Sequence, residues 1–198
     1  MKFFLSVLLV MVFTVLGLPS QGLTDLITYT AILSGPNESP PVSSDGTGFA
    51  TVVYDSTGHS LKVDVTFEDL TGTTTVAHIH AATAIPFTGT VGVATQTPTF
   101  PGFPAGVTSG AYSNIFDLTE TSSFNSSFVT ANGGTAAGAE AALVAAMDSG
   151  KAYFNIHSKF AGGGEIRGFL VVPVPASLLL FGTGLAGLAG IRFRRKKL

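Results

Sequence analysis

The sequence predicts a mostly β fold, an antiparallel β-sandwich or barrel with one short helix. Short segments in which apolar and polar residues alternate recur between residues 26 and 170. Because successive side chains leave opposite faces of a strand, this alternation indicates half-buried β-strands. Stretches rich in Gly, Pro, Ser and Thr separate the segments, and one segment has the composition of a helix. Many short strands with turns between them are typical of a single antiparallel β-domain.

The N-terminal half of this region is expected to contain four strands. In the most regular one, alternate apolar side chains are expected to face inward, namely Leu61, Val63, Val65 and Phe67. The segment before it ends in a turn of Asp, Ser, Thr and Gly, so the two segments predict a hairpin. The expected strands are Leu26–Leu33, Gly48–Tyr54, His59–Glu68 and Thr74–Ala81.

The C-terminal half is less regular and contains the expected helix. Residues 85–110 are rich in Pro, Gly and Thr and predict a long loop, with one short strand at Thr90–Ala94. Ala111–Thr119 and Ser126–Thr130 are further strand candidates. Ala136–Ser149 is rich in Ala, which predicts a helix that Gly150 ends. Its apolar residues Leu143, Val144 and Met147 are expected on one side.

The segment Lys151–Leu170 predicts a second hairpin, which closes the domain. Ala152, Phe154 and Ile156 alternate with Tyr153, Asn155 and His157, so the first three are expected to face the core. Three consecutive glycines at positions 162–164 form the turn, and residues 165–170 form the second strand.

Composition limits the classes of function. The 198 residues contain no Cys, which excludes a disulfide framework and a thiolate metal site or nucleophile. Between residues 23 and 172 there are four basic and twelve acidic residues, a net charge of −8. Nucleic-acid binding needs a basic surface, so we expect no nucleic-acid partner. The acidic excess suits solubility, cations or a cationic partner.

The N-terminus has the pattern of a secretory signal peptide. Lys2 is followed by an apolar run from Phe3 to Leu18 and then by small residues. This order predicts that residues 1–22 are removed on export. The alternative is an uncleaved membrane anchor, for which the apolar run is short.

The C-terminus has the pattern of a membrane-linked sorting signal. Val171–Ile191 is about 21 residues long, enough to cross a bilayer as a helix. Five basic residues within 192–197 would stay in the cytoplasm by the positive-inside tendency. Residues 171–198 resemble the PEP-CTERM class, with the Pro motif made of Val172, Pro173, Val174, Pro175 and Ala176. Val174 stands where the usual motif has Glu.

This resemblance implies an exosortase-type protease as a partner, which would cut near the Pro motif. It also implies the outer surface or extracellular matrix of a Gram-negative bacterium that makes exopolysaccharide, reached after a transient stay in the inner membrane. The alternative is a permanent single-pass anchor.

The intervening residues 23–170 carry a second resemblance. The run ITYTAILSGPNESPPV, the segment Ala77-His78-Ile79-His80 and the segment Tyr153–Gly168 stand in the order typical of the CHRD domain, which is named for chordin. The resemblance implies an immunoglobulin-like β-barrel in an extracellular setting. It implies no established enzymatic activity, and it makes Gly164, Glu165, Arg167 and Gly168 structural parts of the closing hairpin.

Three histidines are the candidate metal ligands. His78 and His80 are two residues apart on an expected strand, so both imidazoles leave the same face. His157 can supply a third nitrogen if its strand lies beside theirs and turns the same face. Three imidazoles suit copper or zinc. In the alternative interpretation the histidines bond loop and backbone groups. We expect His59 to be solvated.

The sequence therefore predicts an exported, surface-sorted β-domain that acts as a binding or matrix component. Exopolysaccharide or another surface protein would be its partner. The alternative is a metal-binding surface protein or a metal-dependent enzyme, similar to superoxide dismutase, that uses the three histidines. Glu165 and Arg167 also share a face, and we expect them to pair with each other or with a loop.

Overall fold

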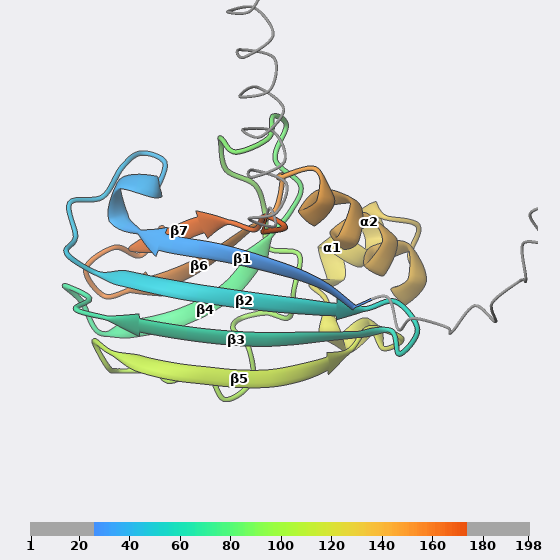
Figure 1. The fold of residues 1–198 in the computed structure, drawn as a ribbon, viewed down its shortest axis with the longest axis horizontal. Coiled ribbons are helices and arrows are strands. Elements are labelled where there is room, and N and C mark those ends of the chain that lie inside the picture. Colours follow the sequence, from blue (N-terminus) through green and yellow to red (C-terminus); the bar gives the residue numbers. More distant parts are fainter. Residues whose placement is uncertain (1–25, 174–198) are drawn as a thin grey trace, which may run out of the picture.

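A computed structural model describes residues 26–173 (Figure 1). Within that range seven strands form one sheet, and two α-helices lie at one end of it. The strands are β1 (Leu26–Ser34), β2 (Thr47–Asp55), β3 (Ser60–Glu68), β4 (Thr74–His80), β5 (Gly110–Asp117), β6 (Tyr153–Ser158) and β7 (Ile166–Phe169). The helices are α1 (Ser126–Ala131) and α2 (Ala136–Asp148), with 3₁₀ turns at Gly35–Asn37 and Thr121–Ser123. The prediction of a mostly β, antiparallel domain is confirmed.

The sheet has the strand order β4-β6-β7-β1-β2-β3-β5, and every neighbouring pair is antiparallel. The predicted first hairpin is β2–β3, in which Tyr54 pairs with Leu61. All four side chains that the alternation places inward are buried, namely Leu61, Val63, Val65 and Phe67. The predicted second hairpin is β6–β7, which lies inside the sheet between β4 and β1.

The sheet curls so that its two ends share one core. Phe100 lies in the long loop between β4 and β5 and is fully buried. Its ring centroid lies 5.1 Å from that of Phe116 on β5 and 5.8 Å from that of Phe154 on β6. Since β5 and β6 stand near opposite ends of the strand order, this one aromatic side chain joins the two ends of the sheet.

The same loop covers the free edge of β4. The backbone N–H of Ala94 donates to the carbonyl of Ile79, and that of Phe100 donates to the carbonyl of Ala77. The Thr99 hydroxyl accepts from the N–H of Ala77 at 2.9 Å. These bonds satisfy edge groups that would otherwise be open to another strand.

Helix α2 covers one end of the curled sheet (Figure 1). The Thr135 side chain caps its N-terminus by accepting from the N–H of Gly138, and Gly150 follows the helix at φ 66°. Leu143 and Met147 are buried as predicted, whereas Val144 is only partly buried.

Two strand predictions are wrong. Ser126–Thr130 falls in helix α1, because the side chain of Asn125 accepts from the backbone N–H of Ser127 and caps the helix. Thr90–Ala94 forms no strand; Val93 makes one isolated bridge with His80.

Strand β6 also differs from the half-buried strand that the alternation predicts. All six of its residues are buried, including Tyr153, Asn155 and His157 on its polar face. The reason is that loops lie over this face: Val91 contacts Tyr153, and the carbonyl of Gly162 lies 2.9 Å from His157 Nδ1.

The predicted signal peptide, residues 1–22, lies outside the described residues. So does most of the predicted sorting segment, of which only residues 171–173 are described. Between residues 26 and 173, no helix is both long and apolar enough to cross a bilayer.

Candidate metal centre

The three candidate histidines lie together on one face of neighbouring strands. In the antiparallel pairing of β4 with β6, Val76 stands opposite His157 and His78 stands opposite Asn155. Paired residues point to the same side of a sheet, so His157 shares a face with Val76. His78 is two residues from Val76 on the same strand, so it shares that face with His157. His80 shares it too, because it is two residues from His78. The geometric condition for a three-histidine cluster is therefore met.

The rings are close enough to act on one ion. The ring centroid of His78 lies 4.8 Å from that of His80 and 4.7 Å from that of His157. One ring nitrogen of each histidine lies within 4.8 Å of the other two. Tetrahedral zinc with Zn–N bonds of about 2.0–2.1 Å holds its nitrogens about 3.4 Å apart. An ion at this site would therefore draw the three rings slightly inward.

On two of the three rings, a hydrogen bond to one nitrogen leaves the other nitrogen free. The Nδ1 atoms of His80 and His157 lie 2.7 and 2.9 Å from the carbonyl oxygens of Val91 and Gly162. A carbonyl only accepts, so each Nδ1 carries the proton and each Nε2 keeps its lone pair. Neither Nε2 has a hydrogen-bond partner within residues 26–173, and the same is true of Nδ1 of His78. Bonding of one ring nitrogen to a carbonyl is the arrangement that orients metal-bound histidines.

Burial keeps the three imidazoles neutral. Their exposed fractions are 5 % for His78 and 8 % for His80 and His157. Desolvation, with a smaller effect from the neighbouring histidines, lowers the pKa of His78 to about 3. Desolvation also lowers the pKa of His80 to about 4 and that of His157 below its usual range, although the carbonyls of Val91 and Gly162 oppose it. Neutral imidazole is the form that binds a metal.

A stack of side chains supports the cluster from one side. The ring of Tyr153 lies parallel to that of His80, with centroids 4.7 Å apart and planes 4° apart. The guanidinium of Arg167 lies 4.7 Å from the Tyr153 centroid. Arg167 is itself fixed, since it donates to the carbonyls of Asn37 and Gly89 at 2.6 and 3.0 Å. This stack limits rotation of the His80 ring.

A buried carboxyl, that of Glu38, lies beside the stack that supports the cluster. Glu38 Oε2 lies 3.6 Å from Nε of Arg167, and both side chains are buried. Glu38 Oε1 and Asn155 Oδ1 lack hydrogen-bond partners within the described part of the chain. The alternation of β6 could have placed Asn155 beside His157, but no local pattern points to Glu38.

The remaining residues of the closing hairpin stabilise loops. Glu165 does not bond Arg167; its carboxylate accepts from the hydroxyls of Ser44 and Ser158 and from the backbone N–H groups of Thr71 and Gly72. Burial alone would raise its pKa, but these hydrogen bonds outweigh it and hold the pKa below the usual range.

The two glycines predicted to be structural make close approaches. A Cβ on Gly164, whose φ is 127°, would lie 2.5 Å from the amide of Asn155. A Cβ on Gly168 would lie 2.3 Å from the carbonyl oxygen of Ile32, where β7 runs against β1. Only glycine fits the first conformation without strain.

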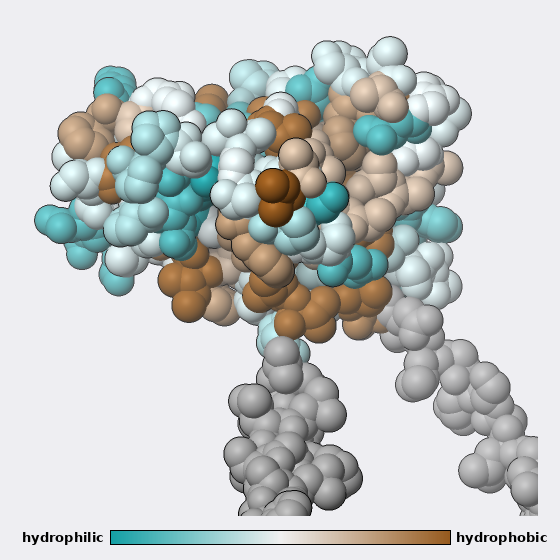
Figure 2. All heavy atoms as spheres, turned by 90° about the horizontal axis from the view of Figure 1, so that it is seen from above, coloured by the Kyte–Doolittle hydropathy of each residue, from teal (hydrophilic) through white to brown (hydrophobic). Residues whose placement is uncertain are grey.

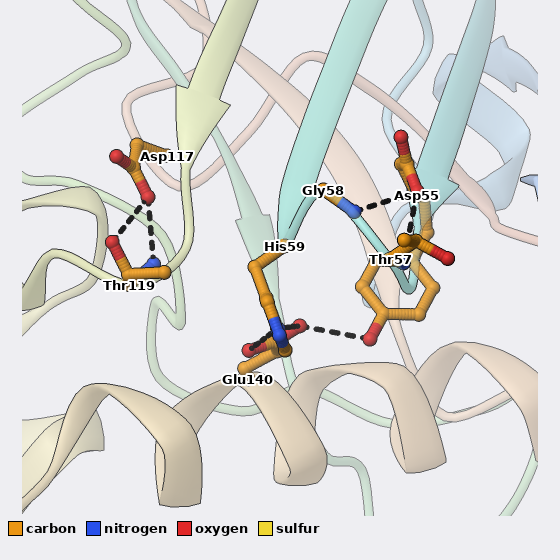
Figure 3. Close-up of polar contacts among 8 residues, drawn as sticks. Asp55, Thr57, Gly58, His59, Asp117, Thr119 and Glu140 are labelled. Atoms are coloured by element: carbon orange, nitrogen blue, oxygen red, sulfur yellow. Dashed lines mark hydrogen bonds and ion pairs between the residues drawn. The ribbon is translucent and has the colours of Figure 1, made fainter. Parts of the chain in front are cut away.

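The fourth histidine takes part in a different cluster (Figure 3). His59 Nδ1 lies 2.9 Å from Glu140 Oε1 on α2, which also accepts from the hydroxyl of Tyr54 at 2.8 Å. The His59 side chain is 52 % exposed. The expectation that His59 is solvated is confirmed, although its ring also contacts Glu140. This residue serves as a control for the cluster of three.

Comparison with protein families gives two matches that together span the described domain and the tail. The CHRD domain model matches residues 29–170. The model of the PEP-CTERM protein-sorting motif matches residues 171–196, which include the Pro motif. Neither the curated proteins nor the solved structures gave a match.

Proposed function

The chain belongs to the CHRD domain family, and from that starting point we propose that its domain binds one copper or zinc ion through His78, His80 and His157. The PEP-CTERM motif makes it an exported, surface-sorted protein of a Gram-negative bacterium and implies processing by an exosortase. In this proposal the domain that contains the metal site lies outside the cell. The immunoglobulin-like form of the barrel and the association with exopolysaccharide stay predictions.

The observation that carries the proposal is the set of three buried nitrogens without partners. A buried polar atom that lacks a hydrogen bond costs on the order of 1–3 kcal/mol. Three such atoms in one cluster would be a considerable cost to an otherwise well-bonded domain. One ion bound to all three nitrogens would remove it.

The ligand set favours particular ions. Imidazole nitrogens suit copper and zinc, whereas calcium and magnesium take oxygen ligands. The buried carboxyl of Glu38 already contacts Arg167, and that of Glu165 already accepts four hydrogen bonds. Three nitrogens would leave a fourth coordination position for water or another small ligand.

Binding is favoured over catalysis by the burial of the site. Each of the three histidines is at least nine-tenths buried, and the loops that carry Val91 and Gly162 lie against two of them. A substrate larger than a water molecule would have to displace these loops. The superoxide dismutase-like alternative stays a prediction that a direct assay of the metal-loaded protein can test.

Metal analysis of the purified full-length chain tests the proposal. After dialysis against a slight excess of zinc or copper we expect about one ion per chain by mass spectrometry, and much less in His78→Ala and His157→Ala. The matched control is His59→Asn, which should keep the full metal content. Sub-stoichiometric metal in the wild-type chain, or equal metal in His78→Ala, would contradict it.

A further inference from the structure

Four apolar side chains form an exposed surface where the described chain ends. We call Ile85, Phe87, Val171 and Val172 the apolar edge; their exposed fractions are 63, 61, 39 and 51 %. Phe87, Val171 and Val172 line one groove. Figure 2 shows apolar side chains gathered along one edge of the domain, the lower edge in that view. Contiguous exposed apolar surface of this kind marks an interaction site.

The edge is held firmly to the domain. The backbone N–H of Phe87 donates to the carbonyl of Gly150 at 2.8 Å, and its ring packs over Gly150, where an added Cβ would lie 2.3 Å away. The Phe87 ring centroid lies 6.0 Å from that of Phe169 on β7. Figure 1 shows this loop, in green, standing out on the side of the domain where β7 leads to the last described residues. Phe87 is therefore held in place against the domain while more than half of its surface stays exposed.

The chain leaves the domain through the same surface. Two backbone hydrogen bonds, at 2.8 and 3.0 Å, join Val171 to Thr30 of β1. Val171, which the sequence pattern makes the first residue of the membrane-crossing segment, therefore belongs to the domain. The apolar run Ser177–Ile191 begins six residues further on. Six residues span at most about 20 Å when fully extended. A bilayer that holds this run is therefore within that distance of Val171 and of the residues around it.

From this placement we propose that the apolar edge is a membrane-docking surface. While the C-terminal segment is still uncut, Ile85 and Phe87 insert into the interfacial region of the same bilayer. Aromatic and aliphatic side chains at this depth stabilise contact between a protein surface and lipid. The inference rests on the membrane anchoring that belongs to the sorting part of the proposed function, and it is independent of the metal site.

Docking would also orient the domain. The anchor alone fixes one point, Val171, about which the domain could turn. Ile85 and Phe87 lie on a separate loop, so their insertion adds a second point of contact. The domain would then no longer rotate freely over the membrane. The Pro motif would be held at one distance from the bilayer and in one orientation relative to it.

A fluorescence experiment on the full-length chain in lipid nanodiscs tests the proposal. The chain contains no Cys, so one introduced Cys places a single environment-sensitive label. The test variants are Phe87→Cys and Ile85→Cys. The second is needed because the Phe87 ring packs on Gly150, so replacing Phe87 can disturb the loop itself. Ile115→Cys on β5 is the control, since Ile115 is 62 % exposed, against 61 % for Phe87.

Brominated phospholipids in the nanodisc quench a label that lies among the lipids. We expect quenching at positions 85 and 87 to be at least twofold stronger than at position 115. Equal quenching at all three positions would overturn the docking proposal. So would labels at 85 and 87 that are shielded from aqueous iodide but not quenched by the lipids, because the tail or a second copy would then cover the edge. Failure of the chain to co-elute with nanodiscs would contradict the anchor prediction and this proposal with it, and would leave the metal proposal standing.

Discussion

Metal added to the metal-free chain is expected to raise its unfolding temperature. The cause lies in the three histidines, each of which is buried with one nitrogen that has no partner within residues 26–173. An ion bound to these nitrogens stabilises the folded state alone, because the unfolded chain does not hold His157 near His78 and His80.

The size of the effect follows from linkage. Free metal at 1,000 times the dissociation constant stabilises a one-site protein by about 4 kcal/mol. For a domain of about 150 residues, 1 kcal/mol corresponds to roughly 2–4 °C. We therefore expect a rise of about 8–16 °C at that concentration, and a rise that grows with the logarithm of metal concentration.

Differential scanning fluorimetry of the full-length chain over a series of zinc or copper concentrations measures this shift. His78→Ala should show little of it. His59→Asn should keep it, and Asn suits the position because His59 has a positive φ of 47°. The reasoning is refuted if the unfolding temperature of the wild-type chain does not depend on metal, or if His78→Ala shows the same dependence.

Two further predictions concern stability. Gly168→Ala should destabilise the domain by about 1–3 kcal/mol, because the new Cβ would lie 2.3 Å from the carbonyl oxygen of Ile32. Gly163→Ala, which meets no atom within 4 Å, should change the denaturant midpoint hardly at all; a similar loss in both variants would contradict the packing argument. Burial raises the pKa of Glu38 to about 7, although Arg167 opposes it. Because the folded state holds the Glu38 proton more tightly than the unfolded state does, this group stabilises the fold at low pH. The contribution is lost as the pH rises through the pKa of the folded state, so the free energy of unfolding should fall between about pH 5 and pH 8. In Glu38→Gln the unfolding temperature should fall less over this pH range than in the wild-type chain. Equal pH profiles of the two chains would contradict the role of Glu38.

The regular strands of this fold could be predicted because their pattern is local. In β3 the apolar side chains alternate without a break, and all four of them are buried as expected. The strand prediction for Ser126–Thr130 is wrong, and the reason is also local. Its Phe, Val and Thr are typical of strands, but Asn125 provides a helix cap that outweighs this preference.

The cluster of three histidines could be predicted only on the condition that the strand of His157 lies beside that of His78 and His80. The spacing of His78 and His80 puts them on one face whatever the fold. Whether His157 joins them depends on the register of β6 against β4, and a shift of one residue would turn it to the opposite side. His78 and His157 are 79 residues apart in the sequence, and the register between their strands is set by the whole sheet, including Phe100 and the loops. The burial of the polar face of β6 depends on those same distant segments.

The position of the closing hairpin within the sheet governs when the domain can fold during export. β6 and β7 are the last strands along the chain, yet they lie between β4 and β1. A chain that crosses the membrane N-terminus first can pair β1, β2 and β3 as soon as they emerge. β4 finds its partner strand only when residues 153–158 have followed. The domain therefore stays incomplete until almost the whole of it is outside, and its final assembly coincides with the arrival of the sorting segment at the membrane.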